Sequence, residues 1–128
     1  MRFLSPVCLL LGLCLPAGLT MASTIACEAE YGGRVERIDL TPAADAWSFQ
    51  TVTLEGRFRF QAQWLPQRAK LKTFLYERRG RAFALLHAAE YPLPASACPM
   101  PDMTFGLNKV YASELEREVF YQCWMRCE

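Results

Sequence analysis

Residues 57–64 of this 128-residue chain read Arg-Phe-Arg-Phe-Gln-Ala-Gln-Trp, a strict alternation of polar and apolar side chains. A period of two residues is typical of a β-strand with one buried face and one exposed face. The sequence therefore predicts a strand here, and its core-facing residues would be Phe58, Phe60, Ala62 and Trp64.

Turn signals on both sides extend this strand into an antiparallel meander from Trp47 to Glu90. Glu55-Gly56 fits a two-residue hairpin loop, because glycine tolerates the positive φ that such loops require. Leu54 would then pair with Arg57, and a one-residue slip would turn every side chain of the preceding strand to the other face. In this register the preceding strand directs these residues to the core: Trp47, Phe49, Thr51 and Thr53.

Two further turns, at 65–68 and at Arg78-Arg79-Gly80-Arg81, predict two more strands with the same core face. The expected pairs include Phe60 with Thr73 and Glu77 with Ala82. The core residues of the third and fourth strands would be Leu71, Thr73, Leu75, Ala84, Leu86 and Ala88. Residues 82–90 are rich in alanine and leucine, and that composition would also suit a helix.

Outside the meander, residues 31–40 are predicted to form an edge strand, with Gly32-Gly33 as a kink, and 41–46 a loop. Four prolines between Pro92 and Phe105 exclude a central strand or a helix there.

A helix is predicted at the C-terminus. Ser113-Glu114-Leu115-Glu116 resembles a capping box, and the apolar residues after it recur at helical spacing. The alternative is a final strand, since 118–125 is rich in residues that favour strands. The fold class expected is therefore α+β: a small antiparallel meander of four or five strands with a C-terminal helix, stapled by disulfides. An all-β domain, barrel-like or sandwich-like, is the alternative.

Residues 1–22 are typical of a signal peptide. Arg2 precedes an apolar run from Phe3 to Leu19, and Thr20-Met21-Ala22 is a small-x-small cleavage site. We expect a single exported domain, 23–128, that is periplasmic or secreted. An uncleaved membrane anchor and a lipoprotein attached at Cys27 are the alternatives. Removing Arg2 from 14 basic residues leaves a mature chain with as many basic residues as the 13 acidic ones.

Four cysteines remain in the predicted mature chain, and an even number in a short exported chain predicts disulfides. They are Cys27, Cys98, Cys123 and Cys127. Three connectivities are possible, and the one expected joins Cys123 and Cys127 outward to Cys27 and Cys98.

Charge is segregated along the meander, because eight basic residues and one acidic residue, Glu77, lie between Arg57 and Arg81. In the predicted register the outer face of the sheet combines cations with aromatic rings, a composition common in protein interfaces. Tyr76 beside Phe83 and Phe74 beside Leu85 would add an apolar patch, covered by the C-terminal segment or by a partner. The predicted partner-binding residues are Arg57, Arg59, Lys70, Lys72, Phe74 and Tyr76. The alternative is a solvated face, balanced by glutamates of the C-terminal segment.

These features predict a non-enzymatic exported binding protein of the inhibitor, immunity or adaptor type, without a cofactor. The partner would be another protein, for which an acidic surface would be complementary. Nucleic acid is not expected, and neither is stable membrane insertion after cleavage. The only histidine, His87, falls on the outer face beside Lys72, and no motif of a hydrolase or of phosphate binding is present. A hydrolase that uses two carboxylates stays open.

Two other functions stay open. One is a copper-binding or thiol-redox protein that uses Cys123, Cys127 and His87, since thiolates and imidazole suit Cu(I). The other is a structural component of an envelope assembly.

Overall fold

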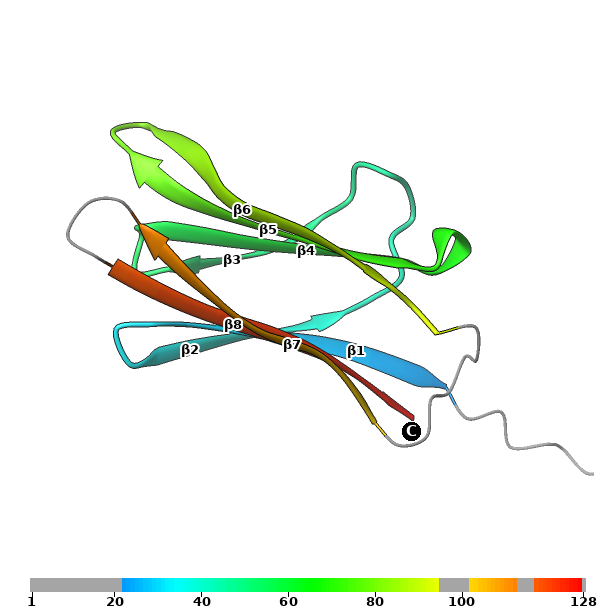
Figure 1. Ribbon diagram of the computed structural model, residues 1–128. Coiled ribbons are helices and arrows are strands. Elements are labelled where there is room, and N and C mark those ends of the chain that lie inside the picture. Colours follow the sequence, from blue (N-terminus) through cyan, green and yellow to red (C-terminus); the bar gives the residue numbers. More distant parts are fainter. Residues whose placement is uncertain (1–21, 95–101, 113–116, 128) are drawn as a thin grey trace, which may run out of the picture.

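A computed structural model describes residues 22–94, 102–112 and 117–127. The described residues form eight antiparallel strands and one short 3₁₀ turn, Pro66–Arg68. The strands are β1 Ser23–Tyr31, β2 Arg34–Leu40, β3 Gln50–Leu54, β4 Phe58–Leu65, β5 Lys70–Arg79, β6 Ala82–Pro92, β7 Met103–Ala112 and β8 Arg117–Cys127. They build two four-stranded sheets, β2-β1-β8-β7 and β3-β4-β5-β6, which lie one above the other (Figure 1).

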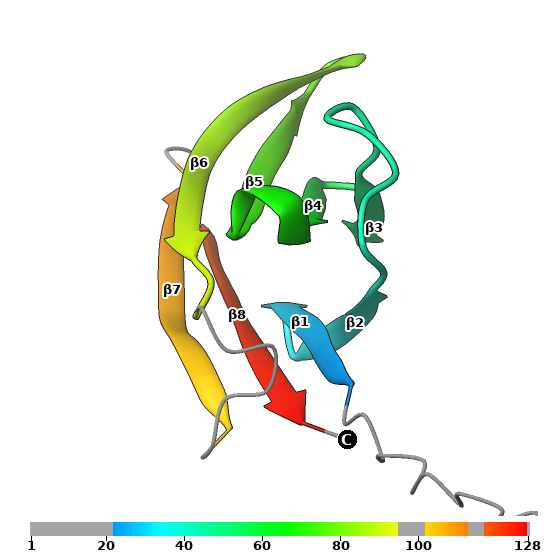
Figure 2. The same ribbon diagram turned by 90° about the vertical axis from the view of Figure 1, so that its right-hand side faces the viewer.

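The two sheets also meet along both edges (Figure 2). Beside β2 and β3, the side-chain Nε2 of Gln50 donates to the carbonyl of Asp39 at 2.9 Å. The backbone N–H of Thr41 donates to Oε1 of the same glutamine at 2.8 Å. Beside β6 and β7, Nδ2 of Asn108 donates to the hydroxyl oxygen of Tyr91 at 2.7 Å. Side-chain hydrogen bonds therefore join the sheets where backbone pairing stops.

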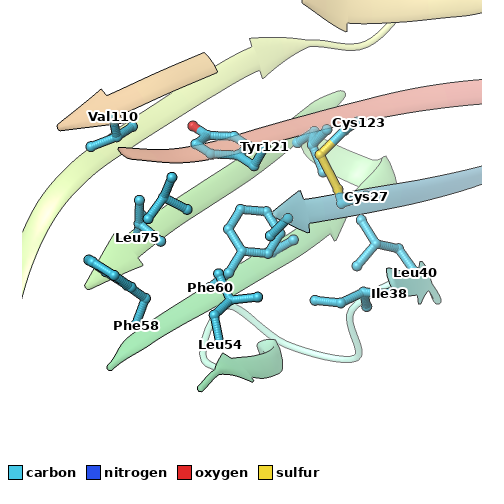
Figure 3. Close-up of a cluster of buried hydrophobic side chains, with 14 of the residues drawn as sticks. Cys27, Ile38, Leu40, Leu54, Phe58, Phe60, Leu75, Val110, Tyr121 and Cys123 are labelled. Carbon is cyan, nitrogen blue, oxygen red and sulfur yellow. A yellow bond between two sulfur atoms is a disulfide. The ribbon is translucent and has the colours of Figure 1, made fainter. Parts of the chain in front are cut away.

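The core lies between the sheets, and both inner faces contribute to it (Figure 3). The predicted core face of β4 is confirmed: Phe58, Phe60 and Ala62 are fully buried, and Trp64 is 9% exposed. The opposite sheet supplies Tyr121, whose ring lies 4.9 Å from that of Phe60. Other fully buried side chains are Ile25, Cys27, Leu54, Leu71, Leu75, Val119 and Cys123.

The disulfide prediction is confirmed for one pair. Cys27 of β1 and Cys123 of β8 are direct cross-strand partners, and a disulfide joins them inside the core (Figure 3). It links positions 96 residues apart and so holds the first described strand to the last one. Cys127 is disulfide-bonded as well, whereas Cys98 lies outside the described residues.

The predicted C-terminal helix is wrong, and so is the α+β class. The segment is strand β8, paired with β1 on one side and with β7 on the other. The alternative strand is confirmed, because Val119, Tyr121, Cys123 and Met125 alternate into the core. In this extended form Cys123 lies directly opposite Cys27. The predicted capping box, 113–116, lies outside the described residues.

The predicted register of the first hairpin is wrong by one residue. Leu54 pairs with Phe58, so the loop has three residues, and two of them, Glu55 and Gly56, have positive φ. The slip turns Val52 and Leu54 toward the core, where Leu54 is 1% exposed. The predicted inward residues Thr51 and Thr53 are exposed instead, and Trp47 and Phe49 precede the strand.

The next two pairings differ from the prediction by two residues, a shift that preserves the faces. Phe60 lies opposite Leu75 rather than Thr73, and Glu77 lies opposite Ala84 rather than Ala82. A bulge then follows in the pairing of β5 with β6, after Leu75. Because the bulge reverses the alternation of β6, His87 lies opposite Leu75 on the inner face, and its predicted place beside Lys72 is wrong.

The edge strand is confirmed as β2, while Tyr31 ends β1, a strand that the sequence did not indicate. Pro92 closes β6, and residues 95–101 of the proline-rich segment lie outside the described part. The predicted signal peptide also lies outside it, apart from residue 22. Within the described ranges, no helix has the length and apolar character needed to cross a membrane.

Candidate protein-binding surface

The six predicted binding residues lie on the sheet β3-β4-β5-β6. Alternation along β4 and β5 directs Arg59, Lys72, Phe74 and Tyr76 away from the core face of Phe60 and Leu75. Lys70 begins β5 at one end of this outer face. Arg57 lies at the opposite end, in the turn between β3 and β4.

Arg59 is held between two aromatic rings. Its guanidinium carbon lies 4.9 Å from the ring centre of Tyr76 and 4.3 Å from that of Phe83. A cation over an aromatic face is attracted by the ring quadrupole. The prediction placed Arg59 beside Phe74, and the two-residue shift of register replaces that neighbour with Tyr76. The contact with Phe83 adds a residue that the predicted site did not include.

The guanidinium of Arg59 forms no ion pair with a carboxylate of the described residues. Its Nε atom is buried without a hydrogen-bond partner. None of the ion pairs within the described ranges includes Arg59. The two rings therefore fix the orientation of a positive charge that no carboxylate of the described residues neutralises.

Lys70 and Lys72 behave differently, because both reach Glu90 on β6. Each Nζ lies 3.3 Å from one of the two carboxylate oxygens. The hydrogen bonds and positive charges of Lys72 and Lys70 hold the pKa of Glu90 below its usual range. One carboxylate therefore pairs with both lysines and offsets one of their two positive charges. Sequence reasoning missed Glu90 as a partner, because its place depends on the register of β6.

The opposite end of the face is rich in arginine. The backbone N–H of Arg78 donates to the carbonyl of Arg57 at 2.7 Å, which brings the turn after β3 beside the end of β5. Figure 1 shows this turn and the β5–β6 turn at the left end of the molecule. Arg79 pairs with the buried Glu77 at 3.4 Å. The four other arginines at this end of the face make no ion pair within the described ranges, and we call them the arginine end: Arg57, Arg59, Arg78 and Arg81.

Apolar side chains lie next to the arginine end. Tyr76 lies opposite Leu85, which is 54% exposed, and Arg78 lies opposite Phe83. The predicted patch is therefore present with different partners. The C-terminal segment cannot cover it, because β8 belongs to the other sheet.

The loop before β3 rests on the far part of this face. Nε2 of Gln63 donates to the carbonyl oxygens of Ser48 at 3.1 Å and of Asp45 at 3.3 Å. The ring of Phe49 meets that of Phe74 edge to face, with centres 5.6 Å apart. Phe49 therefore covers part of the ring of Phe74. The part of the surface that this loop leaves uncovered lies around Arg59 and Leu85.

A second surface, on the sheet β2-β1-β8-β7, was missed. Arg37 and Arg126 lie 5.2 Å and 5.5 Å from the ring centre of Trp124, beside a hollow of about 310 Å³. Both arginines already have carboxylate partners, Asp39 at 2.9 Å and Asp102 at 3.7 Å. Because a helix was predicted for this segment, the position of Trp124 on the outer face of β8 was not predicted.

The interior holds a short polar network. The hydroxyl of Tyr121 lies 2.9 Å from Oγ1 of Thr73 and 2.8 Å from Nδ1 of His87. Burial raises the pKa of Tyr121 well above its ordinary value, although the hydrogen bond with Thr73 acts in the opposite direction. The phenol therefore stays protonated at neutral pH and serves as a hydrogen-bonding link.

The copper and thiol-redox hypothesis receives no support from the cysteines. It needs free thiols at Cys123 and Cys127, whereas Cys123 is bonded to Cys27 and Cys127 is disulfide-bonded too. In the part of the chain that the structure describes, no three His, Cys, Asp or Glu side chains come together as metal ligands would.

Comparisons of the chain with protein-family models, with curated proteins and with solved structures return no match.

Proposed function

We propose that this is a non-enzymatic exported binding protein of the inhibitor, immunity or adaptor type. It docks another protein through the outer face of the sheet β3-β4-β5-β6. The observation that carries the proposal is Arg59, whose charge is fixed by Tyr76 and Phe83 and faces no carboxylate of the described residues. Arginine and tyrosine are among the residues that most often dominate binding energy at protein interfaces.

The scaffold supports this use of the face. The Cys27–Cys123 disulfide lies on the far sheet and does not depend on a partner. The candidate residues lie mainly on regular strands, which hold side chains in more fixed positions than loops do. A preorganised surface loses less conformational entropy when it binds.

Export through the predicted signal peptide is part of the proposal, and the interior disulfide is compatible with an oxidising compartment. Intact mass measured on protein purified from the periplasm tests it. Cleavage after residue 22 and a gain of four hydrogens on reduction are expected. A retained N-terminus or free thiols at Cys98 and Cys127 would argue against the proposed processing or the second disulfide.

The binding function is tested by capture experiments with a charge-reversed double variant, Arg57→Glu with Arg59→Glu. The variant is expected to lose a partner that the wild-type protein retains, while its circular dichroism spectrum and unfolding midpoint stay close to wild type. The matched control is Arg37→Glu with Arg126→Glu, which reverses two charges around Trp124 on the other sheet. Capture that survives in the first variant and is lost in the control would place the interface on the sheet β2-β1-β8-β7 and contradict the proposal.

A further inference from the structure

At the arginine end, positive charges and apolar side chains lie in two neighbouring rows across the sheet. One row runs from Arg59 to Tyr76 and Leu85, and the next contains Arg78 and Phe83. Arg57 continues the second row in the turn, where its carbonyl accepts the N–H of Arg78. Positive charges thus alternate with rings and an aliphatic side chain over strands β4, β5 and β6.

Unneutralised cations in adjacent rows repel one another, because the Coulomb energy of like charges is positive and only partly screened near a protein surface. The other end of the same sheet shows how the chain relieves such repulsion, since Glu90 lies between Lys70 and Lys72. No carboxylate of the described residues does this for Arg57, Arg59 or Arg78. Carboxylates from outside would relieve it.

We propose that the arginine end docks an acidic segment of another protein, with a carboxylate of that segment bound by Arg59 and apolar side chains placed against Phe83 and Leu85. This inference rests on the proposed function and names the class of partner. A guanidinium held by two rings is already ordered, so it can bind a carboxylate through two parallel hydrogen bonds with little further entropic cost. Its Nε atom is buried, so the terminal nitrogens make these bonds.

The charge pattern favours a protein segment over an anionic membrane surface. A membrane attracts basic residues without regard to the orientation of each charge, and a flexible lysine serves as well as an arginine. Here the two flexible lysines share the carboxylate of Glu90, whereas the oriented Arg59 pairs with no carboxylate of the described residues. The exposed Leu85 and the ring of Phe83 match apolar side chains that alternate with the acidic ones.

The test uses the full oxidised mature chain and a fluorescein-labelled peptide in which glutamate and leucine alternate. Fluorescence anisotropy should show saturable binding that weakens as salt is added. The same peptide with glutamine in place of glutamate should not bind. Arg59→Gln should weaken binding about 10- to 100-fold, the range for loss of a charge-assisted hydrogen bond. Arg59→Lys should weaken it nearly as much, because lysine lacks the planar pair of donors.

Lys72→Gln is the matched control, since it removes a cation of the same face that already pairs with Glu90. It should change the affinity by less than about threefold, as a screened surface charge does. NMR of the wild-type protein gives a second readout. The chemical-shift changes that the peptide induces should be confined to residues 57–59 and 76–85.

Three results would overturn the inference. They are the absence of saturable binding of the glutamate peptide, equal binding by the wild type and Arg59→Lys, and binding of phosphatidylglycerol vesicles in preference to the peptide. None of these would remove the proposed function if capture of a protein partner still depended on Arg57 and Arg59. Loss of that dependence would remove the proposed function, whatever the peptide does.

Discussion

The hydroxyl oxygen of Tyr121 lies 2.8 Å from Nδ1 of His87, and this contact joins strand β8 of one sheet to strand β6 of the other. The same oxygen lies 2.9 Å from Oγ1 of Thr73, a fully buried side chain on β5. One phenol thus bridges both sheets. In the tautomer of His87 that has no proton on Nδ1, the hydroxyl of Tyr121 donates to His87 and accepts from the hydroxyl of Thr73. Buried polar groups need such partners, because leaving one unsatisfied is costly.

We expect Tyr121→Phe to destabilise the fold by about 1–3 kcal/mol, since the hydroxyl of Thr73 would lose its partner inside the core. Urea unfolding followed by far-UV circular dichroism measures the change. Tyr111→Phe is the control, because Tyr111 is 64% exposed and its loss of a hydroxyl should cost less than about 0.5 kcal/mol. Equal unfolding midpoints for the two variants would contradict a structural role for the bridge.

Replacing Cys27 and Cys123 together by alanine should cost about 2–5 kcal/mol, because the disulfide closes a long loop of the unfolded chain and fills the core. Thermal unfolding of the double variant, compared with the oxidised wild type, measures this loss. Replacing both residues leaves no unpaired thiol at this site. A loss below about 1 kcal/mol would show that pairing of β1 with β8 is secure without the covalent link.

The register of the first hairpin can be tested with two neighbouring residues. Leu54→Ala should destabilise the protein by about 2–5 kcal/mol, the range for truncating a fully buried leucine. Thr53→Ala should stay within about 0.5 kcal/mol of wild type, because Thr53 is exposed. If Leu54 lay opposite Arg57, Thr53 would face the core and Leu54 would face outward, so Thr53→Ala would be the more destabilising variant. The urea midpoints of these two variants therefore distinguish the two pairings.

The contrast between these strands shows which features the sequence could predict. The face of β4 was predictable because Phe58, Phe60 and Ala62 alternate without a break. The faces of β5 survived an error of two residues, since a strand repeats every two residues. The length of the turn was not predictable from Glu55-Gly56, because positive φ at both residues suits a two-residue loop, whereas the pairing of Leu54 with Phe58 adds Arg57 to the loop.

Long-range pairing explains the larger errors. Residues 119–125 satisfy the spacing of a helix face and of a strand face, and pairing with the distant strands β1 and β7 gives the strand. The bulge after Leu75 has no local sequence signal, yet it turns His87 inward. The candidate site follows the same division. Arg59 and Tyr76 belong to strands whose faces were predictable, whereas Phe83 and Glu90 depend on the pairing of β6.

The loop before β3 should respond to acid through Asp45. Its Oδ1 accepts the backbone N–H of Trp47 at 2.8 Å and the hydroxyl of Ser48 at 2.9 Å. The hydrogen bond from Trp47 and, to a smaller extent, that from Ser48 hold the pKa of Asp45 below its ordinary value. A carboxyl with a lowered pKa stabilises the folded loop above its unfolded pKa of about 4, and the contribution disappears as the pH falls through the lower folded pKa.

We therefore expect the loop to loosen only in strongly acidic solution, with the NMR signals of the Trp47 indole and of Phe49 moving together with the Asp45 carboxyl. Asp45→Ala should reproduce this loosened state at neutral pH, because alanine offers no acceptor to Trp47 or Ser48. Glu90→Gln is the control, since Glu90 also has a lowered pKa but pairs with Lys70 and Lys72 rather than with the loop. If the Trp47 signal titrates in Asp45→Ala as it does in the wild type, another group must hold the loop against Gln63. The titration of Asp45 would then not be the cause of the loosening.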